Sequence, residues 1–202
     1  MGVSVVEPPT SEPVSLDLAK DQCRETGDAQ DGLIATYIMA ARKFAEGFTR
    51  RTFATQTLDC TFDVCTGWPG RVTEGRYWRS RIELPVSPVQ SVVSVKYLDV
   101  DGVERVLAAD QYIVKLDETV PYIEPGYNIV WPALRSQSSG ITVRVIAGWP
   151  EDDFPEDLRL AVLYLVAHYF DNRLPVVSSG MVEVPLAVEA ILSGYRISRI
   201  LS

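Results

Sequence analysis

A single histidine, His168, limits the catalytic chemistry that this chain of 202 residues can carry. A Ser-His-Asp triad needs an imidazole base, and a multi-histidine metal site needs several. His168 lies inside the most apolar stretch of the sequence, where a histidine of the core or of an interface is expected. The sequence also lacks the G-x-S-x-G, H-E-x-x-H and glycine-rich phosphate-loop motifs. These observations argue against an enzyme, although a pair of carboxylates without a recognisable motif stays an alternative.

Carboxylates gather at two places that resemble cation sites. The run Asp99-Val100-Asp101-Gly102 begins like a calcium loop, but its glycine comes too early and Ala108 stands where the loop needs a glutamate. A hairpin turn is the favoured interpretation. A second cluster could hold a divalent cation, but carboxylates are also favoured at the start of a helix; it comprises Glu151, Asp152, Asp153, Glu156 and Asp157. We therefore expect no metal and no cofactor.

The three cysteines do not form a disulfide framework. Cys60 and Cys65 differ by an odd number on one expected strand, so their side chains point to opposite faces. Cys23 stands alone in a helical stretch, and no C-x-x-C spacing occurs. Residues 1–10 also lack the basic start and apolar run of a signal peptide. Free thiols in a reducing cytoplasm are expected.

One local basic patch, the segment Trp68 to Arg81 (WPGRVTEGRYWRSR), stands out in a chain whose formal net charge is −8. Arginine with aromatic residues suits stacking on nucleic acid, but it equally suits a protein interface, and a solvated hairpin loop is a third interpretation. The acidic net charge argues against a protein that binds nucleic acid by neutralising phosphate. We favour a subunit-interface loop, with Trp68, Arg71, Arg76, Tyr77, Trp78 and Arg79 as its candidate residues.

Helical periodicity at both ends of the chain encloses a region of strand periodicity. Helices are expected at 15–25, 30–50 and 155–172, and a final one begins at Pro185. In the second helix a broad apolar stripe should face the core, with Arg42, Lys43, Glu46 and Arg50 on the other side. Between residues 54 and 148, alternation and short turns predict six or seven antiparallel strands. The fold class is therefore α+β, a helical bundle of N-terminal and C-terminal helices with an inserted antiparallel β-sheet subdomain.

The C-terminal part of the chain carries more apolar surface than it can bury alone. The run LRLAVLYLVAHYF over 158–170 is apolar nearly all round, yet it is too short for a bilayer, which needs about 20 residues. The final helix places Val188, Ile191, Leu192 and Tyr195 on one face. That face either folds back on the chain's own core or docks on a different protein, and the sequence favours docking.

Read together, these segments resemble the head–tail connector (adaptor) family of long-tailed phages and gene transfer agents. The resemblance covers nearly the whole chain after residue 12. It rests on the order and spacing of short segments along the chain. These segments are EPVSL (12–16), the helix 31–53 ending in TRRTF, QTL (56–58), IELP (82–85), PVQSV (88–92), VKYLD (95–99), DG (101–102), Tyr112, WP (131–132), AGW (147–149), AHYFDNR (167–173), VPLAVEAIL (184–192) and YR (195–196). The 68–81 loop is longer than is usual in the family, so no family role is transferred to it.

The resemblance implies a non-enzymatic virion protein, located at the head–tail junction and made in the host cytoplasm. It implies a ring, typically of twelve copies, that lies below the portal protein, contacts the next head-completion (stopper) or neck protein, and leaves a channel for double-stranded DNA without reading its sequence. Residues 1–12 would be a flexible N-terminus, 13–174 the connector core and 175–202 a hinge with the portal-docking segment. The candidate docking residues are Val184, Pro185, Leu186, Val188, Ile191, Leu192, Tyr195 and Arg196.

Two other functions remain open at this point. A soluble hydrolase with unrecognised carboxylates would use the C-terminal helices only to complete its core. A monomeric binding module would use the tryptophan-rich loop to take a ligand. Neither alternative, nor the connector, requires a membrane.

Overall fold

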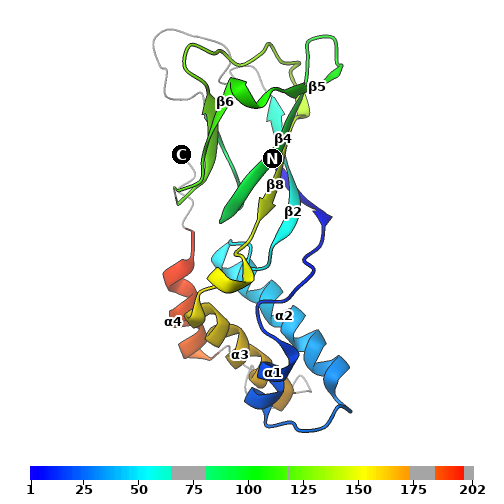
Figure 1. The fold of residues 1–202 in the computed structure, drawn as a ribbon, viewed down its shortest axis with the longest axis vertical. Coiled ribbons are helices and arrows are strands. Elements are labelled where there is room, and N and C mark those ends of the chain that lie inside the picture. Colours follow the sequence, from blue (N-terminus) through cyan, green and yellow to red (C-terminus); the bar gives the residue numbers. More distant parts are fainter. Residues whose placement is uncertain (65–80, 118, 173–184, 198–202) are drawn as a thin grey trace, which may run out of the picture. The chain divides into compact units, whose positions relative to one another are not determined.

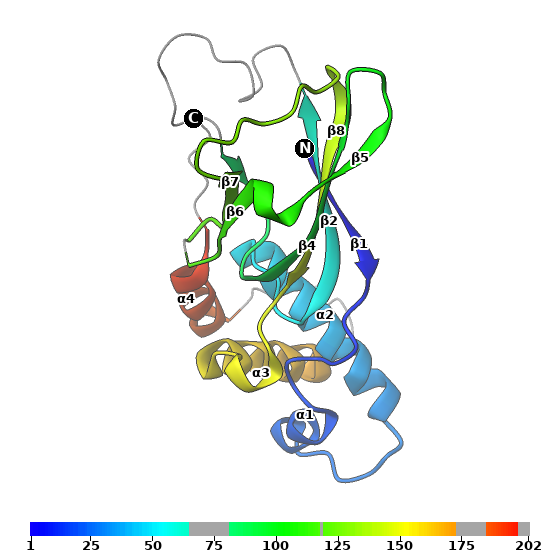
Figure 2. The same ribbon diagram turned by 45° about the horizontal axis from the view of Figure 1, so that its top comes forward.

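The computed structural model describes residues 1–64, 81–117, 119–172 and 185–197, and the chain divides into two compact units. The β unit comprises Met1–Pro9 and Thr55–Gly148, and the helical unit comprises Thr10–Ala54 and Trp149–Ser202. Figures 1 and 2 show antiparallel strands in the one and helices in the other. The predicted α+β class is confirmed.

A five-stranded antiparallel sheet forms the larger part of the β unit, in the order β1-β2-β8-β4-β5. Its strands are β1 (Gly2–Glu7), β2 (Gln56–Val64), β4 (Val89–Leu98), β5 (Glu104–Leu107) and β8 (Gln137–Ala147). Strand β8 is central because both β2 and β4 pair with it along most of its length. A second sheet in the order β3-β7-β6 is formed by β3 (Ile82–Glu83), β6 (Tyr112–Lys115) and β7 (Tyr122–Pro125), with a short 3-10 turn (Ala109–Gln111) before β6.

Strict alternation in β2 explains how the larger sheet gains one apolar face. Leu58, Cys60, Phe62 and Val64 are buried there, beside inward residues of β8 such as Val143 and Val145. The intervening threonines and aspartates of β2 face the other side of the sheet. The predicted strand periodicity therefore describes the observed sheet, although the strands belong to two sheets rather than one.

The expectation of a flexible N-terminus over 1–12 is wrong for Gly2–Glu7. These residues form β1, which pairs antiparallel with β2 and places Val3 opposite Cys60 and Val5 opposite Leu58. The sequence around β1 shows no alternation because every residue of this edge strand is exposed. Its strand conformation comes from the ladder with β2, which lies more than fifty residues further along the chain.

Four helices make up the described part of the helical unit: α1 (Leu16–Cys23), α2 (Asp31–Thr49), α3 (Glu156–Asp171) and α4 (Leu186–Tyr195). Ser15 caps α1 by accepting a hydrogen bond from the backbone N–H of Leu18 (3.3 Å). Pro155 precedes α3, which carries Glu156 and Asp157 in its first turn, as the helix dipole favours. A 3-10 turn (Glu151–Asp153) precedes α3. No described helix has the length and hydropathy that crossing a bilayer demands.

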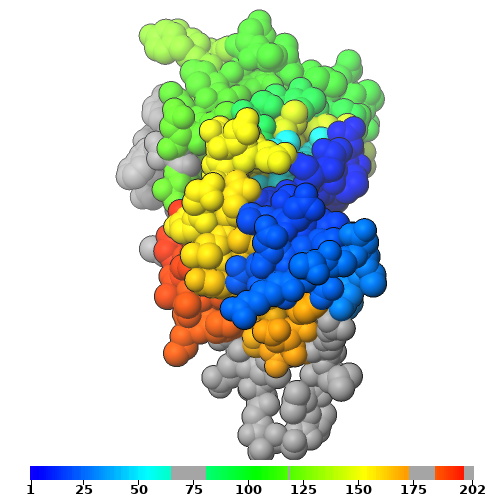
Figure 3. Space-filling model, turned by 60° about the horizontal axis from the view of Figure 1, so that its bottom comes forward, coloured from blue at the N-terminus to red at the C-terminus, as the bar shows by residue number. Residues whose placement is uncertain are grey.

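The apolar helix α3 finds most of its cover inside its own unit. Leu158, Val162, Leu165 and Val166 are fully buried against residues of the other helices. Figure 3 shows α4 (red) and α1 with α2 (blue) on different sides of the C-terminal half of α3 (orange). The sequence suggested that the C-terminal part carries more apolar surface than it can bury alone, but for α3 the greater part of that surface is covered by its own unit.

Candidate functional site

The apolar face of α4, which the sequence suggested for docking on another protein, packs inside the helical unit. Val188 and Leu192 have no exposed surface and belong to the same core as α2 and α3. Ile191 and Tyr195 are half-buried against that core. The prediction that this face lacks cover in its own chain is therefore wrong, because residues of α2 and α3 cover it.

Polar contacts fix the C-terminal end of α4. The Tyr195 hydroxyl lies 2.8 and 2.9 Å from the two carboxylate oxygens of Asp157, and burial is the main reason that the pKa of Tyr195 is raised. The Arg51 Nε donates to the Tyr195 carbonyl (2.7 Å), and the Ile197 N–H donates to the Thr49 carbonyl (3.0 Å). The structure thus ties the end of α4 to both α2 and α3.

Few of the eight candidate docking residues stay accessible. Leu186 is 81% exposed and Arg196 is exposed, with its guanidinium 5.4 Å from the ring centre of Phe48. Pro185 is half-buried, and Val184 lies outside the described residues. The accessible part of the candidate set therefore lies at the two ends of α4 and not along its apolar face.

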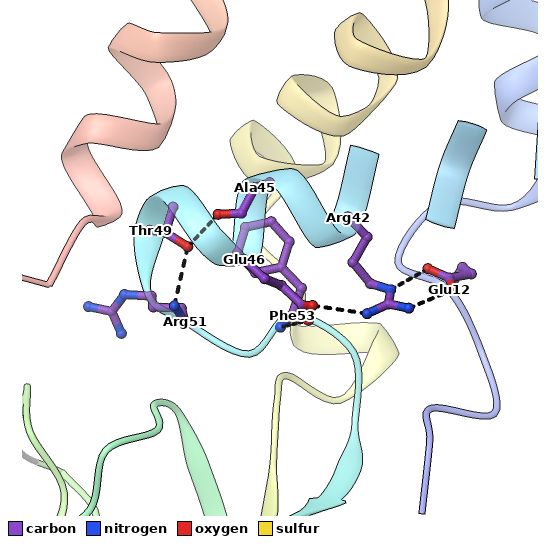
Figure 4. A network of polar contacts seen from close by, with 7 residues as sticks. All are labelled: Glu12, Arg42, Ala45, Glu46, Thr49, Arg51 and Phe53. Atoms are coloured by element: carbon purple, nitrogen blue, oxygen red, sulfur yellow. Dashed lines mark hydrogen bonds and ion pairs between the residues drawn. The ribbon is translucent and has the colours of Figure 1, made fainter. Parts of the chain in front are cut away.

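A buried ion network crosses the middle of the helical unit (Figure 4). Arg42, only 5% exposed, donates from Nε and a terminal nitrogen to both carboxylate oxygens of Glu12 (2.6 and 3.1 Å). Its other terminal nitrogen donates to Glu46 (2.9 Å), and Glu46 in turn accepts from the backbone N–H of Phe53 (2.8 Å). The network joins the segment before α1, helix α2 and the turn after α2.

Burial disfavours the charged forms of both Glu46 and Arg42, but only for Arg42 do the partners outweigh it. Burial raises the pKa of Glu46 above its usual value, and the hydrogen bond from Phe53 and the charge of Arg42 only partly offset the effect. Burial also disfavours the charge on Arg42, but the hydrogen bond with Glu12 and the charge of Glu46 outweigh it, so the pKa of Arg42 is raised. Phe53 itself packs on Trp149 and Phe154, with ring centres 5.8 and 5.4 Å away.

Arg42 and Glu46 correct the expected charge pattern of α2. We expected both on the side away from the core, but Arg42 is buried and Glu46 is half-buried. Arg42 follows Ile38 by four residues and precedes Ala45 by three, which places it on the buried stripe. That spacing was the available signal. The exposed side of α2 keeps Lys43 as its only charge, with Arg50 just beyond the helix.

The 68–81 loop lies outside the described residues except for Arg81. Trp68, Arg71, Arg76, Tyr77, Trp78 and Arg79 therefore stay a prediction. Arg81 pairs with Glu83 (2.7 Å) and lies 4.8 Å from the ring centre of Tyr122. These contacts place Arg81 on the smaller sheet of the β unit.

The residues considered for catalysis or metal binding do not converge. His168 is half-buried on α3, 3.4 Å from the side-chain nitrogen of Asn172. Asp99 accepts from the backbone N–H groups of Asp101 and Val103 (3.1 and 2.9 Å) in the hairpin between β4 and β5. Gly102 there has a φ of 81°. Asp99 to Gly102 thus form the predicted turn, and among the described residues no group of three metal-ligating side chains comes together.

The cysteines can be placed only in part. Cys23 is half-buried and Cys60 is buried, and neither forms a disulfide with a described residue. Burial raises the pKa of the Cys23 thiol, with a smaller contribution from Asp171. Cys65 lies outside the described residues.

Comparison with known proteins supplies a fold match but no family. No family model matches the chain, and no curated protein matches it. A chain from the neck of an empty GTA particle, computed with C6 symmetry, matches with a TM-score of 0.77 and 24% identity, over 100% of this chain and 98% of that one. This chain has the fold of that neck chain.

Two further structures give the same result. A chain from the virion of a native gene transfer agent (GTA) particle has a TM-score of 0.77 and 23% identity, and one from the neck of a native GTA particle, computed with C12 symmetry, has 0.71 and 23%. Each match covers 100% of this chain and 98% of the other. The likeness therefore includes both units and not only the helical bundle.

Proposed function

We propose that this chain is a structural protein of a virion or gene transfer agent particle, where it forms a ring-shaped adaptor in the neck. The observation that carries the proposal is the fold match over the full length of chains from gene transfer agent particles, two of them from necks. The symmetric necks of those particles, C6 and C12, support an assembly of many copies. A ring of twelve copies agrees with both symmetries.

In this proposal the ring lies below the portal protein, contacts a head-completion or neck protein on its other side, and surrounds a channel for double-stranded DNA. The net charge of −8 suits a wall along which a duplex passes, because an acidic surface repels phosphate.

The portal contact is assigned to residues 175–202, but not to the buried face of α4. Val188 and Leu192 could reach a portal only if α4 left its place in the helical unit, and the contacts of Tyr195 oppose that movement. The exposed Leu186 and Arg196 can take part without a rearrangement. The 68–81 loop is assigned to contacts between subunits.

Deletion of the gene in a cell that produces the particles tests the proposal. We expect heads without attached tails, and restoration of complete particles when the gene is supplied in trans. Antibodies against the chain should label the neck of purified particles in electron micrographs. Complete particles formed without the protein, or purified particles that lack it, would overturn the proposal.

A further inference from the structure

Two helix faces of the helical unit are exposed and yet almost without charge. Helix α2 has eight exposed positions, of which only Lys43 is charged; the others are Gly32, Leu33, Ala35, Thr36, Met39, Ala40 and Gly47. Helix α4 has six, of which only Glu189 is charged; the others are Leu186, Ala187, Ala190, Ser193 and Gly194. A helix face that stays in water normally carries charged and polar residues, and charged residues make up 23% of this chain. These two faces, the α2 outer face and the α4 outer face, therefore call for a partner.

Small residues on both faces would let another helix approach closely. A side chain added at Gly32, Gly47 or Gly194 would meet no other atom within 4 Å, so packing inside the unit gives no reason for these glycines. A glycine within a helix costs about 1 kcal/mol relative to alanine. Thr36 donates its hydroxyl to the Gly32 carbonyl (2.8 Å), which satisfies it within α2. The α2 outer face is thus shallow, apolar at Met39, and free of bulky charged groups apart from Lys43.

The lone charges on the two faces are opposite. Neither the side-chain ammonium of Lys43 nor the side-chain carboxylate of Glu189 makes a hydrogen bond or ion pair with any described residue of the chain. Lys43 lies between Met39 and Gly47 along the α2 outer face, and Glu189 adjoins Ala190 on the α4 outer face. The two faces therefore complement each other in charge as well as in their low polarity.

The two faces also lie on different sides of the same unit. Figures 1 and 3 show α4 on one flank of α3 and most of α2 on the other. One molecule cannot bring both outer faces together, but two molecules can. A contact between two different faces repeats from copy to copy and closes into a ring when the rotation allows it.

We propose that the α2 outer face of one copy packs on the α4 outer face of the next copy, with Lys43 paired to Glu189 across the contact. The occupant of each face is thus a second copy of this chain. The inference rests on the proposed ring and specifies which surfaces form it. The contact is centred on Glu189 and Ala190, so that Leu186 and Arg196 at the two ends of α4 stay available to the portal.

Paired cysteines test the contact directly. In the full chain, Ala40→Cys and Ala190→Cys are introduced singly and together, and purified chain and purified particles are treated with a short bismaleimide. The double variant should give a ladder of covalent multimers on a denaturing gel, because each copy is linked to two neighbours. The single variants and the unchanged chain, which carries the native cysteines, should give none.

Charge reversal provides an independent test of the α2–α4 contact. Lys43→Glu and Glu189→Lys should each weaken self-association by about tenfold, since each sets like charges against each other. The double variant should recover association to within about threefold of the unchanged chain. Sedimentation velocity over a range of protein concentrations measures this, and 0.5 M salt should reduce the differences.

The outcomes separate this inference from the proposed function. If particles contain the protein but the double-cysteine variant gives no ladder, the α2–α4 contact is wrong while the neck function stands. A dimer from Ala40→Cys alone would also overturn it, because the α2 faces would then pair with each other. If particles lack the protein, the neck function fails, and the purified chain decides the inference: a ladder supports it and its absence overturns it.

Discussion

The β unit and the helical unit distribute their charges in opposite ways. On the outer face of the larger sheet, Arg144 donates to both carboxylate oxygens of Asp59 (2.8 Å each), and Lys96 pairs with Glu104 (2.9 Å). In the helical unit the corresponding ion network, around Arg42, is buried, while the outer faces of α2 and α4 carry one charge each. This part of the sheet face is thus suited to water, whereas the outer faces of α2 and α4 are suited to contact with protein.

This difference indicates which ion pairs the stability of each unit depends on. Exposed ion pairs contribute little to stability because water already solvates the separated groups. A buried pair contributes little net free energy when it is intact, but the loss of one partner leaves an uncompensated charge. The Arg42 network is therefore a sensitive point of the fold, and the Asp59–Arg144 pair is not.

Replacement of Arg42 should have the largest effect. Arg42→Ala leaves the carboxylates of Glu12 and Glu46 without their partner, and we expect the helical unit to lose about 3–5 kcal/mol of stability. Urea unfolding, followed by hydrogen exchange in each unit, measures this loss. The matched change in the β unit, Arg144→Ala, should shift the midpoint of urea unfolding much less than Arg42→Ala does. Equal losses in both units would contradict the comparison.

Truncation of the buried face of α4 should have the next largest effect. Val188→Ala removes two buried carbon atoms, and we expect a loss of about 2 kcal/mol with faster amide exchange in α4. Ala190→Ser, on the exposed side of the same helix, serves as the control and should stay within about 0.5 kcal/mol. If Val188→Ala left the exchange of α4 unchanged, the described docking of this helix would be incorrect.

Acidification should change the contributions of Glu46 and Asp59 to stability with opposite signs. The folded state holds a proton on Glu46 more tightly than the unfolded chain does, because burial raises the pKa of Glu46. The stability of the unchanged chain relative to Glu46→Gln should therefore fall as the pH rises from Glu46's ordinary pKa of 4.5 to its raised value.

In the β unit the hydrogen bond from Arg144 lowers the pKa of Asp59. Its contribution is fully present above the ordinary pKa of 3.8, and it should be lost as the pH falls through the lowered value. Denaturation of the unchanged chain, Glu46→Gln and Asp59→Asn at several pH values measures both trends. Trends of the same sign in the two variants would contradict the assignment.

The smallest effect on stability is expected on the outer faces. Met39→Lys on α2 and Val106→Lys on β5 replace side chains that are 42% and 63% exposed, so each should change the free energy of unfolding by less than about 0.5 kcal/mol. A measurement of self-association should distinguish the two variants. Only Met39→Lys should weaken it, because only this change adds charge to the proposed subunit contact. A matching loss of association in Val106→Lys would show that the β unit also forms the contact.

The sequence predicted those parts of the fold in which one face is buried by neighbouring elements. The stripe of α2 gave that helix within one residue of its observed bounds, and the strand periodicity predicted after residue 54 agrees with β2. The spacing of α2 also places Arg42 on the buried stripe, but the sequence could not show its partner Glu12, which lies thirty residues earlier in the chain. It also could not assign β1 or the side on which α4 packs, because both depend on pairing with distant segments. The apolar pattern of α4 in the sequence is the same whether this face packs on the chain's own core or on another protein.

Each unit is built from two stretches of the chain that are separated in sequence, and this has a consequence for biosynthesis. When α1 and α2 leave the ribosome, Ile34 and Ile38 have no cover, because their partner α3 lies more than a hundred residues further along the chain. The β unit must be translated in the interval, and β1 must wait for β2. Nascent chains therefore pass through a long period in which apolar helix surface is open to chaperones and to aggregation.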